Sequence, residues 1–182
     1  MGSEMCIRDR DYAQQGGHIV RLKSGDGGLF GRLEEELIVL REAGIDYEII
    51  PGVPSAFAAA AAAGIPLTRR LTARRIQFVT GHDASGQLPE DVNLPALADP
   101  TATTVVFMGK RTFSQLQKQL QQHGLPPDTP AILVEAVSTP QQTLQRTTIG
   151  ALADQLETEI SASPALILYG PLAEGTPDDG QD

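Results

Sequence analysis

The residues best placed to do chemistry form a glycine-rich loop, Ser24-Gly25-Asp26-Gly27-Gly28, between a β-rich run and an amphipathic helical pattern. Its glycines let backbone N–H and C=O groups approach a ligand without a side-chain clash. Asp26 offers a carboxylate for hydroxyl or ammonium groups at the carboxyl end of a predicted strand, where open α/β sheets bind ligands. The pattern therefore indicates a small-molecule site, although a plain turn with Asp26 as a helix N-cap explains the same residues.

The loop does not match the two common nucleotide-binding motifs. A dinucleotide fingerprint requires G-x-G-x-x-G, and counting from Gly25 places Phe30 where the third glycine belongs. A P-loop closes with Gly-Lys-Ser/Thr, whereas the nearby Lys23 precedes this loop. Both interpretations are excluded.

Charge and composition narrow the class of protein. The net charge of −9 argues against a nucleic-acid surface, because phosphate backbones require a basic face. No apolar run approaches the roughly 20 residues that span a bilayer, so no membrane association is expected. Cys6 is the only cysteine, which favours a reducing compartment, the cytoplasm. The spacing of the three histidines predicts no metal site.

The elements that must position the loop alternate between β-rich runs and helical patterns, which predicts an α/β fold with a largely parallel sheet. Helices are expected at residues 30–43, 54–64, 112–123 and 148–160, with Gly44 and Gly64 ending the first two and Thr148 capping the last. Strands are expected at residues 18–23, 47–50, 75–80, 103–108, 131–135 and 165–169.

Composition divides the chain into four parts. Residues 1–10 carry no signal-peptide, cap or strand pattern and are expected to be a non-native or disordered leader. A break rich in arginine, proline and glycine at residues 64–75 separates residues 11–67 from residues 68–172 and is expected to be a linker. The acidic residues 173–182 are expected to be a disordered tail.

Seven motifs in the right order resemble the tetrapyrrole (corrin/porphyrin) methyltransferase family, over roughly residues 16–170. The loop segment "RLKSGDGGLFGRLEEE" resembles the family's "RLKGGDPFxFGRGxEE", and "AGIDYEIIPGVPSA" resembles its "AGIPFEVVPGITSA". The remaining motifs are "AGIPLTRR", "FVTGH", "TTVVFMGKRT", "TPAILVEAVSTPQQ" and "SPALILYG".

The resemblance implies a two-domain α/β methylase fold, a homodimer, and transfer of methyl groups from S-adenosylmethionine to a tetrapyrrole, with S-adenosylhomocysteine as product. The most similar members methylate uroporphyrinogen III at C2 and C7 to give precorrin-2, for siroheme and cobalamin synthesis. Two alternatives stay open. One is another corrin-ring methylase such as precorrin-4 methyltransferase, and the other is a ligand-binding fragment without catalysis.

The resemblance also assigns site residues position by position. Tetrapyrrole carboxylates require cations, and Arg32, Arg69 and Arg70 are the candidates that would bind them. Pro54 replaces a family threonine, and Gly27-Gly28 replaces Pro-Phe, which softens the loop. Cofactor contacts are implied for Ser24, Gly25, Asp26, Leu29, Pro54, Ser55, Met108 and Val137.

The family's opening strand, its "GxGPGDPxLLT" loop and its "YDxLV" segment have no counterpart in this sequence. In the family these stretches hold a further cofactor loop and the acid and base. We therefore expect an N-terminally truncated methyltransferase, with an incomplete first domain, a complete second domain and little activity alone.

Overall fold

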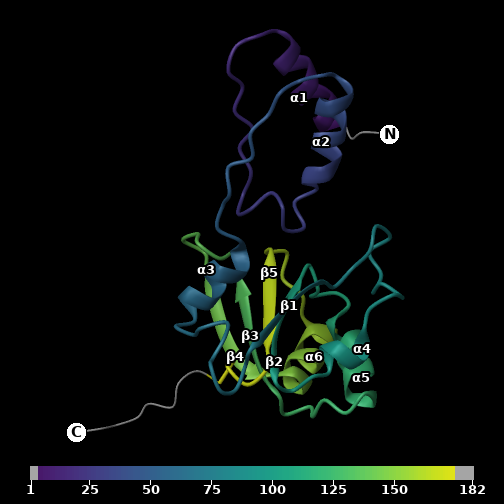
Figure 1. Ribbon diagram of the computed structural model, residues 1–182. Helices are drawn as coiled ribbons and strands as arrows, with labels where there is room; N and C mark the ends of the chain where they lie inside the picture. The colour runs from purple at the N-terminus through teal and green to yellow at the C-terminus, as the bar shows by residue number, and fades with distance from the viewer. Residues whose placement is uncertain (1–3, 175–182) are drawn as a thin grey trace, which may run out of the picture. The chain divides into compact units, whose positions relative to one another are not determined.

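The chain folds into two compact units, residues 1–55 and 56–182, in a computed structural model that describes residues 4–174 (Figure 1). The division falls at the start of helix α3 (Ser55–Ala62), earlier than the predicted boundary after Leu67. Most of the tail expected to be disordered lies outside the described residues. Ala173, the first residue of that expected tail, is buried.

Two helices of the first unit, α1 (Glu4–Gln14) and α2 (Leu33–Glu42), lie against each other (Figure 1). Residues 4–10, expected to be a non-native or disordered leader, belong to α1. Residues 4–14 contain no proline or glycine to interrupt a helix, and packing against a second helix stabilises short helices that are marginal alone.

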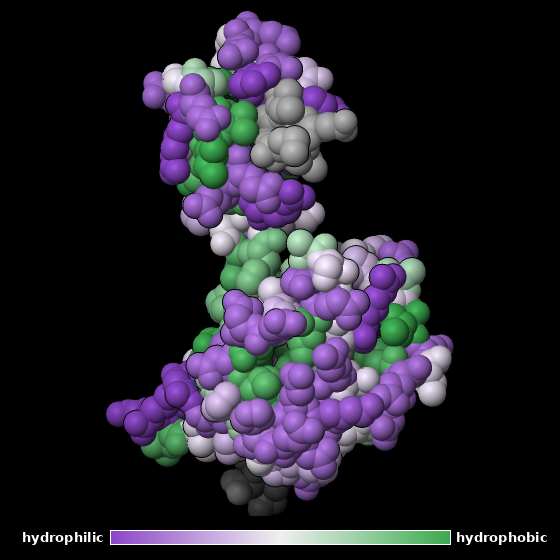
Figure 2. Space-filling model, turned by 90° about the vertical axis from the view of Figure 1, so that its right-hand side faces the viewer, coloured by the Kyte–Doolittle hydropathy of each residue, from purple (hydrophilic) through white to green (hydrophobic). Residues whose placement is uncertain are grey.

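The predicted strands at residues 18–23 and 47–50 are wrong. Neither segment forms a strand, because a strand requires a neighbour for its N–H and C=O groups and the described residues of the first unit supply none. Their apolar side chains stay exposed, with Leu22 83% and Ile50 74% exposed. Figure 2 shows hydrophobic side chains at the surface of this unit among hydrophilic ones.

The second unit contains a five-stranded sheet in the order β1-β2-β5-β3-β4. The α/β class is confirmed, but the expectation of a largely parallel sheet is wrong: only β1 and β2 pair in parallel, and the other three pairs are antiparallel. β5 inserts between β2 and β3, and the short β3–β4 connection permits only an antiparallel pair. The strands are β1 (Arg75–Thr80), β2 (Ala102–Phe107), β3 (Pro130–Glu135), β4 (Thr143–Thr148) and β5 (Ala165–Tyr169).

Helices cover both faces of the sheet. On one face α4 (Leu94–Leu97), α5 (Phe113–Gln122) and α6 (Ile149–Thr158) pack through the main apolar cluster, which takes Val106 from β2 (Figure 1). Because side chains alternate along a strand, Phe107 points to the opposite face. There it makes an edge-on contact with Phe78, which in turn contacts Phe57 of α3.

Three helix-end predictions are confirmed. Gly44 and Gly64 follow α2 and α3 with φ angles of 65° and 66°, the left-handed backbone that glycine adopts without a Cβ penalty. At the start of α6, the Ala151 N–H donates to the Thr148 side chain at 3.3 Å. Local chemistry therefore fixes these boundaries.

Replacing Tyr169 by phenylalanine is expected to lower the free energy of unfolding by about 1–2 kcal/mol. The buried Tyr169 hydroxyl donates to the Leu97 carbonyl at 2.9 Å and ties β5 to α4, so the substitution leaves that carbonyl unpaired. Urea unfolding followed by circular dichroism measures the change. Tyr12→Phe is the control, since Tyr12 is 51% exposed; equal losses for both variants contradict the assignment.

Candidate functional site

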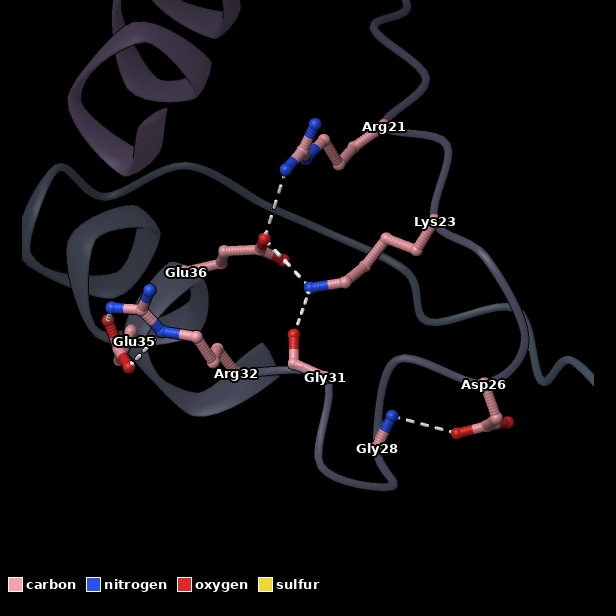
Figure 3. Close-up of polar contacts among 8 residues, drawn as sticks. All are labelled: Arg21, Lys23, Asp26, Gly28, Gly31, Arg32, Glu35 and Glu36. Carbon is pink, nitrogen blue, oxygen red and sulfur yellow. Dashed lines mark hydrogen bonds and ion pairs between the residues drawn. The ribbon is translucent and has the colours of Figure 1, made fainter. Parts of the chain in front are cut away.

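The glycine loop is held by Asp26, whose carboxylate joins two segments of the first unit. Its Oδ1 accepts the Gly28 N–H and its Oδ2 accepts the Gly52 N–H, both at 2.8 Å (the Gly28 bond is drawn in Figure 3). These bonds, from Gly52 first and Gly28 second, hold the pKa of Asp26 below its ordinary value of 3.8. The interpretation of Asp26 as a helix N-cap is wrong, because Arg32 occupies that position.

The second segment approaches the loop so closely that it requires glycine. A Cβ on Gly52 would overlap the carbonyl of Gly25, and a Cβ on Gly25 would lie 3.5 Å from the Val53 carbonyl. Ser24 and Gly25 are thereby held beside Pro54 and Ser55, which the sequence assigns to the same ligand. Gly52 was missed because a single glycine beside a proline is the signal of an ordinary turn.

Lys23 closes the loop from its other side, as Figure 3 shows. Its ammonium donates to the Gly31 carbonyl at 2.5 Å and pairs with the Glu36 carboxylate of α2 at 2.8 Å. Lys23 therefore connects the start of the loop to the helix that follows it. From the sequence alone, the position of Lys23 indicated only that the loop is not a P-loop.

The entry to α2 carries two residues in left-handed backbone, Phe30 at φ 52° and Arg32 at φ 57°. Arg32 donates through Nε and Nη2 to both carboxylate oxygens of Glu35, at 2.7 and 2.6 Å (Figure 3). The guanidinium of this predicted substrate-binding residue is therefore already paired with a carboxylate of the protein. A depression of about 410 Å³ is lined by the loop and the first two turns of α2, including Gly28 and Leu37.

The other predicted contacts lie in the second unit, at the edge where β2 and β3 end. Phe107 and Val134 both pair with Leu166 of β5, which places Met108 and Val137 just beyond the same edge. Met108 is 45% exposed and Val137 is partly buried. The backbone turns sharply there: Met108, Ala136 and Ser138 have φ angles of 54°, 47° and 64°. Left-handed backbone at non-glycine residues concentrates at functional sites.

The loops after β1 and β2 meet at this edge through two glycines. A Cβ on Gly81 would overlap the Cα of Gly109, and the Gly81 N–H donates to the Phe107 carbonyl at 2.7 Å. The Thr112 hydroxyl donates to the Gly81 carbonyl. The next residue, His82, has a buried Nδ1 with no hydrogen-bond partner among the described residues.

Two of the three predicted substrate arginines lie together in the second unit, in a tight turn after α3. The backbones of Arg69 and Ala73 exchange hydrogen bonds at 2.8 and 3.1 Å, and Arg74 donates to the Arg70 carbonyl at 2.8 Å. Arg70 is exposed. Arg32 belongs to the other unit.

The first-unit contacts are thus assembled around one hydrogen-bonded loop. Leu29 is half-buried and its N–H donates to the Asp26 carbonyl at 3.4 Å.

Within residues 4–174, no group of three His, Cys, Asp or Glu side chains could hold a metal ion. None of the helices in that range is long and apolar enough to cross a membrane.

Protonation of Asp26 is expected to release the loop in acid. A carboxyl group whose pKa is lowered in the folded state stabilises the fold above its unfolded pKa, and that contribution disappears as the pH falls through the lowered value. The amide resonances of Gly28 and Gly52 should therefore shift together with a midpoint below pH 3.8. Asp26→Asn should abolish this titration; a midpoint above 3.8 contradicts the two hydrogen bonds.

Residues 3–153 match the family described as Tetrapyrrole (Corrin/Porphyrin) Methylases. Siroheme synthase 1 of Aeromonas hydrophila is 46% identical over 160 residues, which cover 88% of this chain and 34% of the relative. The chain spans between a third and a half of the length of the curated relatives it matches.

Two solved structures share the fold. Uroporphyrin-III C-methyltransferase from Thermus thermophilus, complexed with S-adenosylhomocysteine, superposes with a TM-score of 0.80 at 31% identity, over 94% of this chain and 74% of that one. A cobalamin biosynthetic enzyme, cobalt precorrin-4 methyltransferase, gives 0.81 at 30% identity, over 93% and 71%. The fold is that of a tetrapyrrole methylase. This chain belongs to the tetrapyrrole (corrin/porphyrin) methylase family.

Proposed function

We propose that the chain forms the cofactor-binding part of an S-adenosylmethionine-dependent methyltransferase that methylates uroporphyrinogen III. The observation that carries the proposal is the apposition of the 24–28 loop and the 51–55 segment through the Asp26–Gly52 hydrogen bond. This bond gathers the residues that the family resemblance assigns to the cofactor. Similarity to a structure complexed with S-adenosylhomocysteine supports the assignment.

The residues present suit that cofactor. Ser24 and Gly25 are exposed. Gly25 has a φ of 73° and no side chain, so a ligand can approach its backbone directly. In the second unit Met108 offers an exposed, polarizable thioether side chain at the sheet edge. We assign polar contacts with the cofactor to the loop and Ser55, and apolar contacts to Leu29, Pro54, Met108 and Val137.

When bound, S-adenosylmethionine supplies an activated methyl group on a sulfonium. The chain's task is to align the donor and to exclude water, and orientation of two reactants contributes much of the acceleration in such transfers. Asp26 serves this task by fixing the loop, since both of its oxygens accept backbone N–H groups. We assign the base that removes the proton from the methylated carbon to none of the described residues.

The carboxylates of the tetrapyrrole would bind to arginine side chains. Arg70 is exposed and Arg69 shares its turn, so we assign substrate binding to these two. Arg32 is the weaker of the three candidates because Glu35 already accepts two hydrogen bonds from it.

A second candidate substrate is precorrin-4, because the cobalt precorrin-4 enzyme superposes as well as the uroporphyrin-III enzyme does. A third possibility is ligand binding without catalysis. These three candidate functions differ in which tetrapyrrole, if any, receives the methyl group, so a binding measurement and a transfer measurement distinguish them.

The experiment is isothermal titration of the chain with S-adenosylhomocysteine, followed by transfer of a labelled methyl group from S-adenosylmethionine to uroporphyrinogen III or precorrin-4. Binding with only weak labelling of uroporphyrinogen III is the expected result, because none of the described residues is assigned as the base. Labelling of precorrin-4 alone selects the second candidate, and binding without labelling selects the non-catalytic fragment. Absence of binding overturns the proposal.

The resemblance also leads us to propose a homodimer in the cytoplasm. Sedimentation equilibrium of the purified chain measures the first property. Fractionation of cells that express the untagged chain measures the second.

A further inference from the structure

A partly buried lysine at the edge of the sheet joins three segments of the second unit. Lys110 follows β2 by three residues, Glu135 ends β3, and residues 161–163 connect α6 to β5. β5 lies between β2 and β3, so a side chain that links their ends must reach across it. Lys110 does so.

The lysine ammonium is surrounded by acceptors. Its Nζ lies 2.6 Å from Glu135 Oε1, 2.8 Å from both the carbonyl and the hydroxyl oxygen of Ser161, and 2.6 Å from the Ser163 carbonyl. The Ser161 hydroxyl also donates to Glu135. The side chains of Lys110 and Glu135 are only 11% and 19% exposed, so solvent screens the pair little.

The ends of this ion pair adjoin the two residues assigned to the cofactor in this unit. Met108 lies two residues before Lys110, and Val137 lies two residues after Glu135. Both loops contain left-handed non-glycine backbone, at Met108 and at Ala136. Such backbone persists only where surrounding contacts determine it. The Lys110–Glu135 ion pair joins the loop after β2 to the end of β3, where the second loop begins.

We propose that Lys110 is a positioning residue that sets the backbone of Met108 and Val137 for cofactor binding without itself touching the cofactor. The inference rests on the proposed function, because it gives a role to two of the assigned contacts. The partly buried Lys110 ammonium orders the two loops through its ion pair and hydrogen bonds, and neither phosphate nor metal is involved.

Another lysine of the same unit provides a matched control. Lys118 of α5 pairs with Glu157 of α6 at the same 2.6 Å, but the two side chains are 66% and 46% exposed. Exposed pairs contribute little, whereas removing one partner of a buried pair leaves the other charge uncompensated. Lys118→Met therefore removes an ion pair of equal length away from the sheet edge.

The test compares three proteins, the unsubstituted chain, Lys110→Met and Lys118→Met, by two measurements. Amide hydrogen exchange without ligand should rise in Lys110→Met at residues 108–109 and 136–138 and stay unchanged in Lys118→Met. Titration with S-adenosylhomocysteine should show Kd raised by about tenfold or more in Lys110→Met and by less than about twofold in Lys118→Met. Lys110→Arg, which keeps the charge, should recover part of the affinity.

The outcomes separate this inference from the function on which it rests. If the unsubstituted chain binds and Lys110→Met binds equally well, the positioning role is wrong while the proposed function stands. If the unsubstituted chain does not bind, the proposed function fails and takes the inference with it. Should Lys110→Met not fold, Ser161→Ala removes one acceptor and keeps both charges. An unchanged Kd in that variant also overturns the inference.

Discussion

Replacing Gly52 by alanine is expected to weaken binding of S-adenosylhomocysteine by about 10- to 100-fold. The added Cβ would overlap the Gly25 carbonyl, so the 24–28 loop and the 51–55 segment must separate. Overpacking of this kind costs about 1–3 kcal/mol, and each 1.4 kcal/mol is a factor of ten in Kd. Separation also breaks the hydrogen bond from the Gly52 N–H to Asp26. Isothermal titration measures the effect.

The loss should concern binding more than folding, because both segments are at the surface and can move apart. Val53→Ala is the matched control: it truncates a neighbouring side chain that is 67% exposed and should leave Kd within about twofold. Equal affinities for Gly52→Ala and Val53→Ala would show that the loop binds nothing.

Replacing Gly81 by alanine is expected to destabilise the second unit by about 1–3 kcal/mol and to weaken ligand binding with it. A Cβ there would overlap the backbone of Gly109, which follows Met108 directly. The buried loops cannot simply separate, because the Gly81 carbonyl also accepts the hydroxyl of Thr112. Urea unfolding followed by circular dichroism gives the free energy.

Glu90→Ala controls for this prediction, since Glu90 is exposed in the same connection between β1 and β2. It should unfold at the urea concentration of the unsubstituted chain. If Gly81→Ala does the same, the close approach of the two glycine loops carries no energetic weight.

Sequence patterns predicted the second unit well wherever burial and local chemistry agree. The strand at residues 75–80 and the helix capped by Thr148 are found as expected, because apolar runs and cap residues act over a few positions. β4 was missed because "TLQRTT" is a polar edge strand with one exposed leucine. Its pairing with β3 arises from the hairpin connection, which apolar periodicity does not encode.

The first unit shows the limit of reasoning from composition. "HIVRLK" and "YEII" have the residues of strands, yet strand formation depends on a partner that no local pattern can reveal. The candidate site divides in the same way. Asp26 was recognisable as a polar group in a glycine loop, whereas the roles of Gly52 and Lys110 depend on segments distant in sequence.

The position of β5 has a consequence for the chain during its synthesis. Among the described residues, the last strand to be made, β5, is the middle strand of the sheet and hydrogen-bonds to β2 on one side and β3 on the other. Until residues 165–169 leave the ribosome, β1–β2 and β3–β4 are two separate ribbons with open inner edges. Such edges are prone to pair with other chains, so nascent second units should depend on chaperones until translation has passed Leu172, which is buried in the finished fold.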